Sequence, residues 1–258
     1  MFHVEHVAPQ PANRPDDRGR TAPPWSAPRT RRSAGCSLHV ERPAAWHTAL
    51  VTTPPPSANL DEVLEQSRAH GFLGPGPVSP QRRHAEAFLP SLRGRRRVLD
   101  LGSGGGLPGL VLASAMPDCG FVLLDGNERR CRFLERSVDA LGLQGRVRIE
   151  LGRAEELARR PDLRGGFDAV VARSFGPPAA TAECAAGFLG EPGDLLVVSE
   201  PPEGSAERWP PEGLEVLGLR PVGLQLEEGA TLQLIEVVAP CPETVPRRVG
   251  LPAKRPLF

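Results

Sequence analysis

From residue 95 onwards, short apolar runs alternate with segments whose apolar positions recur at helical spacing. The apolar runs predict five buried strands and two later β segments, at residues 96–102, 120–126, 146–151, 167–174, 194–200, 214–225 and 231–239. The segments between them predict helices at residues 107–115, 127–143, 154–160 and 178–190. Apolar strands joined by helices are typical of a parallel sheet that is buried on both faces. We therefore predict an α/β fold with a seven-stranded, mostly parallel sheet and helices on both faces.

The first 57 residues lack this pattern. They are rich in Pro, Arg, Ala and Ser, and such a composition cannot bury enough apolar surface to become ordered. Two short helices are predicted after them, at residues 60–70 and 81–92. We expect four parts: a disordered extension (1–57), an N-terminal helical segment (58–94), a sheet domain (95–242) and a basic C-terminal tail (243–258).

The charge is balanced overall but unevenly placed. Residues 1–57 carry seven arginines against four acids, and residues 243–258 carry four cations against one acid, so each end has a net charge of +3. The whole chain has 31 cations and 31 acids, which leaves −6 between the ends. Cationic ends on an acidic body suggest a polyanionic partner. Solvated tails are an alternative that the charge alone leaves open.

Five cysteines are scattered along the chain, and none of them forms a C-x-x-C pair. An odd number without metal-ligand spacing favours neither a disulfide framework nor a zinc site, so we expect no metal. The sequence has no signal-peptide core and no apolar run of membrane-spanning length. We expect a cytoplasmic monomer that does not contact membranes.

A glycine-rich turn follows the first predicted strand. It reads Asp100-x-Gly102-x-Gly104-x-Gly106, and Leu107 stands where the dinucleotide fingerprint G-x-G-x-x-G has its third glycine. Glycines let the backbone approach a ligand, and the following helix directs its N-terminus at negative charge. The pattern resembles the first motif of the class I S-adenosylmethionine methyltransferases. A tight turn without a ligand is the alternative.

Asp125 ends the second predicted strand, 21 residues after Gly104. Ligands in open α/β sheets bind beyond the carboxyl ends of the strands, so both residues are expected at one site. A carboxylate there can accept hydrogen bonds from both ribose hydroxyls. NAD enzymes use the same device, and a solvated strand-end acid is also possible, so Asp125 alone does not discriminate.

The residues after the fourth strand limit the chemistry. Residues 172–178 contain a Pro-Pro pair but lack the Asn/Asp-Pro-Pro-aromatic order that is typical of amino-methylating enzymes. Methylation of pyrimidine C5 needs a cysteine nucleophile, but Cys184 has no preceding proline and Cys241 is far away in the sequence. Guanine N7 has an in-plane lone pair and no proton. Its methylation needs no general base, and we expect catalysis by proximity.

Several longer stretches resemble the small-subunit ribosomal RNA guanine-N7 methyltransferases, also called the glucose-inhibited division protein B family. The stretches are "VLDLGSGGGLPGLVLA", "LLDGNERRCRFLERSVDALGL", "GRAEEL", "FDAVVARSFGP" and "VPRRVGLPAKRPL". The resemblance implies the Rossmann-like class I methyltransferase fold, with residues 95–242 as the S-adenosylmethionine-binding domain. It also implies that the cofactor is S-adenosyl-L-methionine and that the substrate is guanine N7 in 16S ribosomal RNA.

The resemblance assigns further residues to the cofactor: Gly102, Leu107, Ala154, Glu155 and Arg173. Ala154 is small enough to leave room for a flat adenine ring. Glu155 is expected to accept a hydrogen bond from the adenine amine, or else to cap a helix. Arg173 is expected to orient the methionine carboxylate or a phosphate, or else to form a surface ion pair.

The C-terminal tail is cationic and stiffened by prolines. Arg247, Arg248, Lys254 and Arg255 are expected to bind RNA phosphates, with a loose solvated tail as the alternative. Removing residues 243–258 is accordingly expected to abolish RNA methylation and to spare cofactor binding.

One departure from the family pattern concerns the fifth strand. Glu200 stands near its end, where the family usually has Lys-Gly, so a cation near the substrate has become an acid. Two alternatives follow: a cofactor-binding protein that acts as an interaction or regulatory module without catalysis, and a class I methyltransferase with a different substrate.

Overall fold

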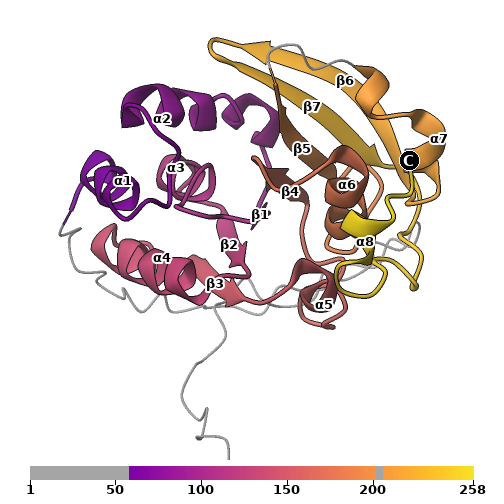
Figure 1. Cartoon of the computed structure of the whole chain (residues 1–258), viewed down its shortest axis with the longest axis horizontal. Coiled ribbons are helices and arrows are strands. Elements are labelled where there is room, and N and C mark those ends of the chain that lie inside the picture. Colours follow the sequence, from indigo (N-terminus) through magenta and orange to yellow (C-terminus); the bar gives the residue numbers. More distant parts are fainter. Residues whose placement is uncertain (1–57, 202–205) are drawn as a thin grey trace, which may run out of the picture.

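The computed structural model describes residues 58–201 and 206–258 (Figure 1), so the expected disorder of residues 1–57 lies outside the described residues. The strands are β1 (Arg97–Leu101), β2 (Gly120–Asp125), β3 (Val147–Leu151), β4 (Ala169–Ala172), β5 (Leu195–Glu200), β6 (Leu219–Glu227) and β7 (Ala230–Val237). The α-helices are α1 (Leu60–Ala69), α2 (Val78–Glu86), α3 (Gly109–Ala115), α4 (Glu128–Ala140), α5 (Ala154–Leu157), α6 (Pro178–Ala186), α7 (Pro211–Glu215) and α8 (Leu251–Lys254). Two 3₁₀ turns are η1 (Leu89–Leu92) and η2 (Ala206–Arg208).

The seven strands form one sheet in the order β3-β2-β1-β4-β5-β7-β6. β1 runs parallel to β2 and β4, with Leu99 opposite both Val122 and Val170, whereas β7 runs antiparallel to β5 and β6. The predicted α/β fold with a mostly parallel sheet is confirmed. The chain reverses its direction of winding at β1, and the carboxyl ends of β1 and β4 border the crevice where such sheets bind ligands.

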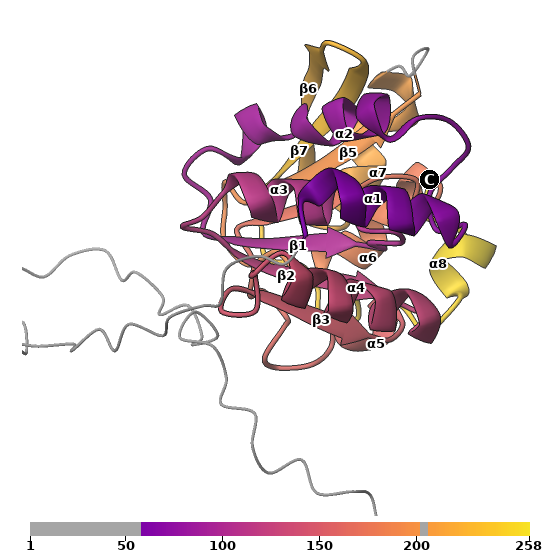
Figure 2. The ribbon, with the colours of Figure 1, turned by 90° about the vertical axis from the view of Figure 1, so that its left-hand side faces the viewer.

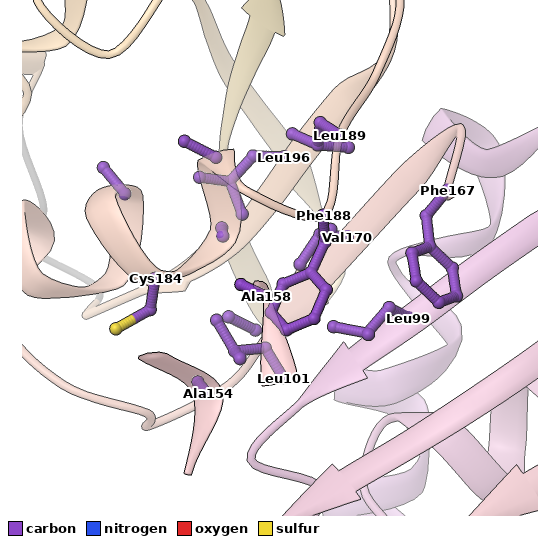
Figure 3. Packing of buried hydrophobic residues seen from close by; sticks show 14 of the residues in the cluster. Leu99, Leu101, Ala154, Ala158, Phe167, Val170, Cys184, Phe188, Leu189 and Leu196 are labelled. Carbon is purple, nitrogen blue, oxygen red and sulfur yellow. The ribbon is translucent and has the colours of Figure 1, made fainter. Parts of the chain in front are cut away.

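Side chains from the two faces of the sheet fill two apolar layers. One layer lies between the sheet and the helices α5, α6 and α7, and it contains Leu99 and Val170 (Figure 3). The other layer lies between the sheet and the helices α1, α3 and α4, and it contains Val98 and Phe121. Neighbouring residues of β1 therefore point into opposite layers, as the two-residue period of a strand requires. Figure 1 shows the two helix groups on opposite sides of the strands.

The N-terminal helices belong to the same packed body. Asn59 caps α1 by accepting a hydrogen bond from the amide of Glu62, whose side chain accepts one from the amide of Asn59. Leu64 of α1 and Val78 of α2 pack with Val111 of α3 in a buried cluster. This cluster holds α1 and α2 over the glycine-rich turn. None of the helices within residues 58–201 and 206–258 is long and apolar enough to cross a membrane.

Several element boundaries differ from the sequence-based prediction, and two of the differences have a clear physical cause. The apolar run near 214–225 begins in helix α7, which starts at Pro211, and Gly218 with φ 74° turns the chain before β6. The predicted helix at 81–92 instead starts at Val78 and ends at Glu86, and a 3₁₀ turn containing Pro90 follows it. Proline lacks the amide hydrogen that a continuing α-helix needs.

Candidate active site

The turn after β1 is the glycine loop that the sequence predicted. Gly102, Gly104 and Gly106 have φ values of 76°, 55° and 102°, in the left-handed region that favours glycine. The amides of Gly102 and Ser103 both donate to the carbonyl of Leu124 at 2.9 Å, so the loop lies against the end of β2. The backbone of this loop is thereby fixed at the carboxyl edge of the sheet.

Asp125 joins the glycine loop to the end of β2. Its Oδ2 accepts a hydrogen bond from the amide of Gly104 at 2.8 Å, and its Oδ1 accepts one from the amide of Asn127 at 2.8 Å. The Nη1 atom of Arg130 lies 3.7 Å from Oδ2. The Asp125 side chain is 6% exposed. The structure thus brings together Gly104 and Asp125, which the sequence placed at one site from the strand-end rule.

Asp100 supports the loop from inside the fold. It is fully buried, and its Oδ2 accepts a hydrogen bond from the amide of Gly109 at 3.0 Å, which satisfies the first turn of α3. Among the described residues its Oδ1 has no hydrogen-bond partner. Burial raises the pKa of the Asp100 carboxyl to about 7, against the opposing effect of hydrogen bonds from Ser103 and Gly109.

A cavity of about 180 Å³ opens at the carboxyl ends of the parallel strands. Its walls come from the glycine loop, from the turns after β2, β3 and β4, and from α6 and α8. The predicted cofactor residues Gly102, Ala154 and Glu155 line it, as do Phe175 and Pro252. Residues that are far apart in the sequence therefore meet at this edge of the sheet.

A larger cavity, of about 510 Å³, lies at the opposite edge of the strands. It is bordered by the segments that lead into β1 and β2, including Arg93, Arg95 and Met116. The glycine loop and the strand-end carboxylate do not reach it, and ligands in open α/β sheets bind at the carboxyl edge. The smaller cavity is therefore the candidate active site.

Ala154 and Glu155 begin helix α5 beside the cavity, and each is 4% exposed. The Oε1 atom of Glu155 accepts hydrogen bonds from the amide of Gly250 at 2.9 Å and from Nη2 of Arg153 at 3.2 Å. Burial pushes the pKa of Glu155 up, but these hydrogen bonds outweigh burial and lower it overall. Glu155 thus remains ionised and fastens the C-terminal tail to the rim of the cavity.

Leu107 and Arg173 do not line the cavity. Leu107 is 6% exposed and packs with Val111 in the core that α1, α2 and α3 share. Nη1 of Arg173 donates to the carbonyl of Gln81 at 3.2 Å. Burial lowers the pKa of Arg173, and the charge of Asp100 partly offsets this effect. Contact between a cofactor and these two residues stays a prediction.

The four cations of the tail fall into two groups. Arg247 donates to Glu183, which is fully buried: Nε lies 2.8 Å from Oε1 and Nη2 lies 2.6 Å from Oε2. Its guanidinium is thus bound within the chain. Arg248, Lys254 and Arg255 are exposed, and their contact with RNA phosphates stays a prediction. The tail itself is docked, because Val245 is buried in the layer beneath α6.

Glu200, the departure from the family pattern, is buried and forms an ion pair within the fold. It is 5% exposed, and its Oε1 accepts a hydrogen bond from Nε1 of Trp209 at 3.1 Å. Its Oε2 is paired with the guanidinium of Arg208. The carboxylate therefore presents no free negative charge to a substrate. Glu200 is accordingly not expected to repel RNA.

Phe175, Pro252 and Ala253 line the cavity without having been predicted. Phe175 follows Ser174, which at φ 55° is the only non-glycine among residues 58–201 and 206–258 with a positive φ. This turn directs the Phe175 ring toward Gly102, where a Cβ atom would come within 2.7 Å of the ring. An aromatic residue after the fourth strand was a usable signal for Phe175, whereas no local pattern marks Pro252 or Ala253.

The family model described as "GidB: rRNA small subunit methyltransferase G" matches residues 86–201. A relative from Deinococcus deserti with the name "Ribosomal RNA small subunit methyltransferase G" is 36% identical over 174 residues, covering 65% of this chain and 70% of the relative. This chain belongs to the small-subunit ribosomal RNA methyltransferase G family. A relative of the same name from Synechococcus sp. (strain CC9311) is 35% identical over 168 residues, covering 63% of this chain and 66% of the relative.

The family match covers the segment that builds most of the cavity, including Gly102, Asp125 and Ala154. Among solved structures, the riboflavin-analogue dimethyltransferase RosA from Streptomyces davawensis superposes with a TM-score of 0.52. The sequences are 18% identical, and the match covers 62% of this chain and 55% of that one. This likeness agrees with the Rossmann-like methyltransferase fold.

Proposed function

We propose that this chain transfers a methyl group from S-adenosylmethionine to N7 of a guanine in small-subunit ribosomal RNA. The observation that carries the proposal is the family match over residues 86–201, which contain the glycine loop and the strand-end carboxylate. The relatives from Deinococcus and Synechococcus are named as ribosomal RNA small subunit methyltransferases. Their identity extends over about two thirds of each relative.

The residues around the cavity fit S-adenosylmethionine. Gly102 lines the cavity with φ 76°, and it has no side chain to block a ligand there. Each oxygen of Asp125 accepts one backbone amide and keeps a lone pair for a ribose hydroxyl. Leu124 and Gly126, on either side of Asp125, line the cavity. The small side chain of Ala154 leaves space for the adenine ring.

Bound S-adenosylmethionine supplies an electrophilic methyl group on a sulfonium. Guanine N7 carries a lone pair and no proton, so the chain needs to orient the two partners and exclude water. Cys184 borders the cavity, but burial raises the pKa of its thiol to about 12. The thiol stays protonated at neutral pH and is a poor nucleophile. This argues against the cysteine-dependent methylation of pyrimidine C5.

The test is nucleoside mass spectrometry on small-subunit ribosomal RNA from the source strain with and without the gene. We expect the deletion to remove one 7-methylguanosine and the wild-type gene to restore it. Gly102→Asp should fail to restore it, because φ is 76° and a Cβ would come within 2.7 Å of Phe175. Gly145→Asp is the matched control, since a Cβ there meets no heavy atom within 4 Å.

An unchanged nucleoside profile in the deletion strain would overturn the proposed substrate. Loss of a different methylated nucleoside would keep the methyltransferase activity and overturn guanine N7 as the acceptor. Complementation by Gly102→Asp at the wild-type level would show that the activity does not depend on the glycine loop.

A further inference from the structure

Another cavity, of about 190 Å³, lies on the outer side of α4, and the proposed function does not account for it. It is lined by His70 and Phe72 from the segment between α1 and α2, and by Arg129, Arg132 and Arg136 from α4. Two aromatic rings and three guanidinium groups thus meet in one depression. His70 and Phe72 precede the segment that the family model matches, so they belong to this chain's own N-terminal part.

The two rings rest on a buried third ring. The centroids of His70 and Phe72 lie 5.7 Å apart, and each ring meets Phe133 edge-on, at centroid distances of 5.7 and 5.6 Å. Phe133 is 3% exposed and belongs to the core, whereas His70 is exposed. Such edge-to-face contacts fix ring orientation. The pair therefore forms a rigid aromatic ledge, defined here as His70 and Phe72.

The arginines lie along one face of α4 because positions i, i+3 and i+7 of a helix share a side. All three are exposed. Within the part of the chain that the structure describes, no carboxylate forms an ion pair with Arg129 or Arg136, and Arg132 pairs with Glu128 at 2.5 Å. Both partners of that pair are more than 60% exposed, so the pair is weak and exchangeable. The depression therefore offers positive charge to a ligand.

The elements that form the depression also contact the glycine loop and the strand-end carboxylate of the proposed active site. Helix α4 begins three residues after Asp125, and Arg130 on its first turn approaches that carboxylate. On the other wall, Oγ of Ser67 donates to the carbonyl of Gly105 at 2.8 Å, so the end of α1 is seated on the glycine loop. Figure 2 shows α1 and α4 on the same side of the molecule. A strand of RNA that reaches the active site can extend across this depression.

We propose that the depression binds single-stranded RNA, with an unstacked base on the aromatic ledge and phosphates on Arg129, Arg132 and Arg136. The inference rests on the proposed function for the identity of the polymer. A flat ring surface takes any base by stacking, and guanidinium groups pair with phosphates. An aromatic ledge beside a cationic helix suits an unpaired strand, because bases in a duplex are already stacked.

The test measures binding of a fluorescein-labelled, single-stranded oligoribonucleotide of mixed sequence to the purified full chain. We expect His70→Ala combined with Phe72→Leu to weaken binding by about 5- to 150-fold, the effect of losing one stacked base. We expect Arg129→Gln, Arg132→Gln and Arg136→Gln together to reduce the slope of log K against log salt by about 2, since each single-strand phosphate contributes about 0.7.

A triple variant elsewhere is the matched control. Arg68→Gln, Arg83→Gln and Arg220→Gln remove the same charge from three exposed positions that do not line the depression. This control should keep most of the affinity. Circular dichroism and S-adenosylmethionine affinity, unchanged in every variant, would separate loss of RNA contact from misfolding.

The outcomes separate the two proposals. If the wild type methylates ribosomal RNA but both variants bind RNA as the control does, the depression is not the RNA site and the inference is overturned. If the wild type binds RNA with the expected dependence on the ledge and the arginines but methylates no ribosomal RNA, the inference stands and the proposed function fails. Equal affinity for a duplex of the same sequence would overturn the stacking role of the ledge.

Discussion

Arg247 of the C-terminal tail forms an ion pair with the buried Glu183, and Arg247→Gln is expected to break it. Glu183 is fully buried and accepts hydrogen bonds from the amide and Nε of Arg247, each at 2.8 Å, and from Nη2 at 2.6 Å. Glutamine keeps the amide contact but removes the positive charge. Leaving a buried charge without its partner lowers the free energy of unfolding by about 3–5 kcal/mol. That is a large part of the roughly 5–15 kcal/mol by which a domain of this kind is stable.

The tail of the variant can also detach from the rest of the fold, which would let water reach Glu183. The loss in the free energy of unfolding would then be limited to the free energy with which the tail docks. In both cases the cavity is damaged, because Pro252 forms part of its wall and the amide of Gly250 bonds to Glu155. We therefore expect the affinity for S-adenosylmethionine to fall by about tenfold or more, which corresponds to at least ~1.4 kcal/mol. Removing residues 243–258 would then impair cofactor binding too, so truncation does not isolate RNA binding.

The assay is urea unfolding followed by circular dichroism, with calorimetric titration of S-adenosylmethionine alongside. Arg220→Gln is the control, since its pair with Glu236 is exposed on the arginine side and should contribute about 0–1 kcal/mol. Adding Glu183→Gln to Arg247→Gln removes the stranded charge and should recover part of the stability. The reasoning is refuted if Arg247→Gln costs no more than the control, or if the second substitution makes the loss larger.

Three further predictions concern the glycine loop and its supports. Gly109→Ala should cost at least about 1–3 kcal/mol in urea unfolding, because its Cβ would overlap Asp100 and Leu123, whereas Gly145→Ala should stay within ~0.5 kcal/mol. Burial raises the pKa of Asp100 from 3.8 to about 7, so unfolding releases a proton in this window and stability falls as pH rises through it, by at most ~1.4 kcal/mol per pH unit. Asp100→Asn should remove this dependence of the unfolding free energy on pH. A variant whose pH profile runs parallel to that of the wild type would contradict the inference that Asp100 is protonated in the folded protein. Asp125→Ala should weaken S-adenosylmethionine binding by at least about 10- to 150-fold in calorimetric titration, since the loss of even one charged hydrogen bond costs ~1.5–3 kcal/mol; an unchanged affinity would exclude Asp125 from the site.

The sequence was informative where function depends on local chemistry at the end of a strand. Positive-φ glycines after β1 and an acid after β2 leave a readable pattern, and parallel strands bring such positions to one edge. Gly102, Gly104 and Asp125 were placed correctly relative to one another for this reason. The α/β order followed from the alternation of apolar strands and helices in the same way.

The sequence was uninformative where a role depends on a partner distant in the chain. Arg247 looked like an RNA contact because it is a cation in a basic tail, but its partner Glu183 lies 64 positions earlier. Glu200 looked like a charge reversal at the substrate, yet Trp209 and Arg208 bind it inside the fold. Neither periodicity nor spacing records whether a charged side chain is paired, because pairing is decided by tertiary packing.

The position of Glu155 connects the two halves of the proposed activity. Its backbone begins α5 on the cavity wall, while its carboxylate holds the amide of Gly250 in the tail. The exposed Lys254 and Arg255 follow Gly250 directly through the short helix α8, whose Pro252 also lines the cavity. A rigid link of this kind sets the place of the tail cations relative to the methyl-donor cavity. If RNA phosphates bind these cations, Glu155 fixes the distance between the bound phosphates and the cavity that the RNA strand must span. Loss of this one carboxylate should then disturb cofactor binding and RNA placement together.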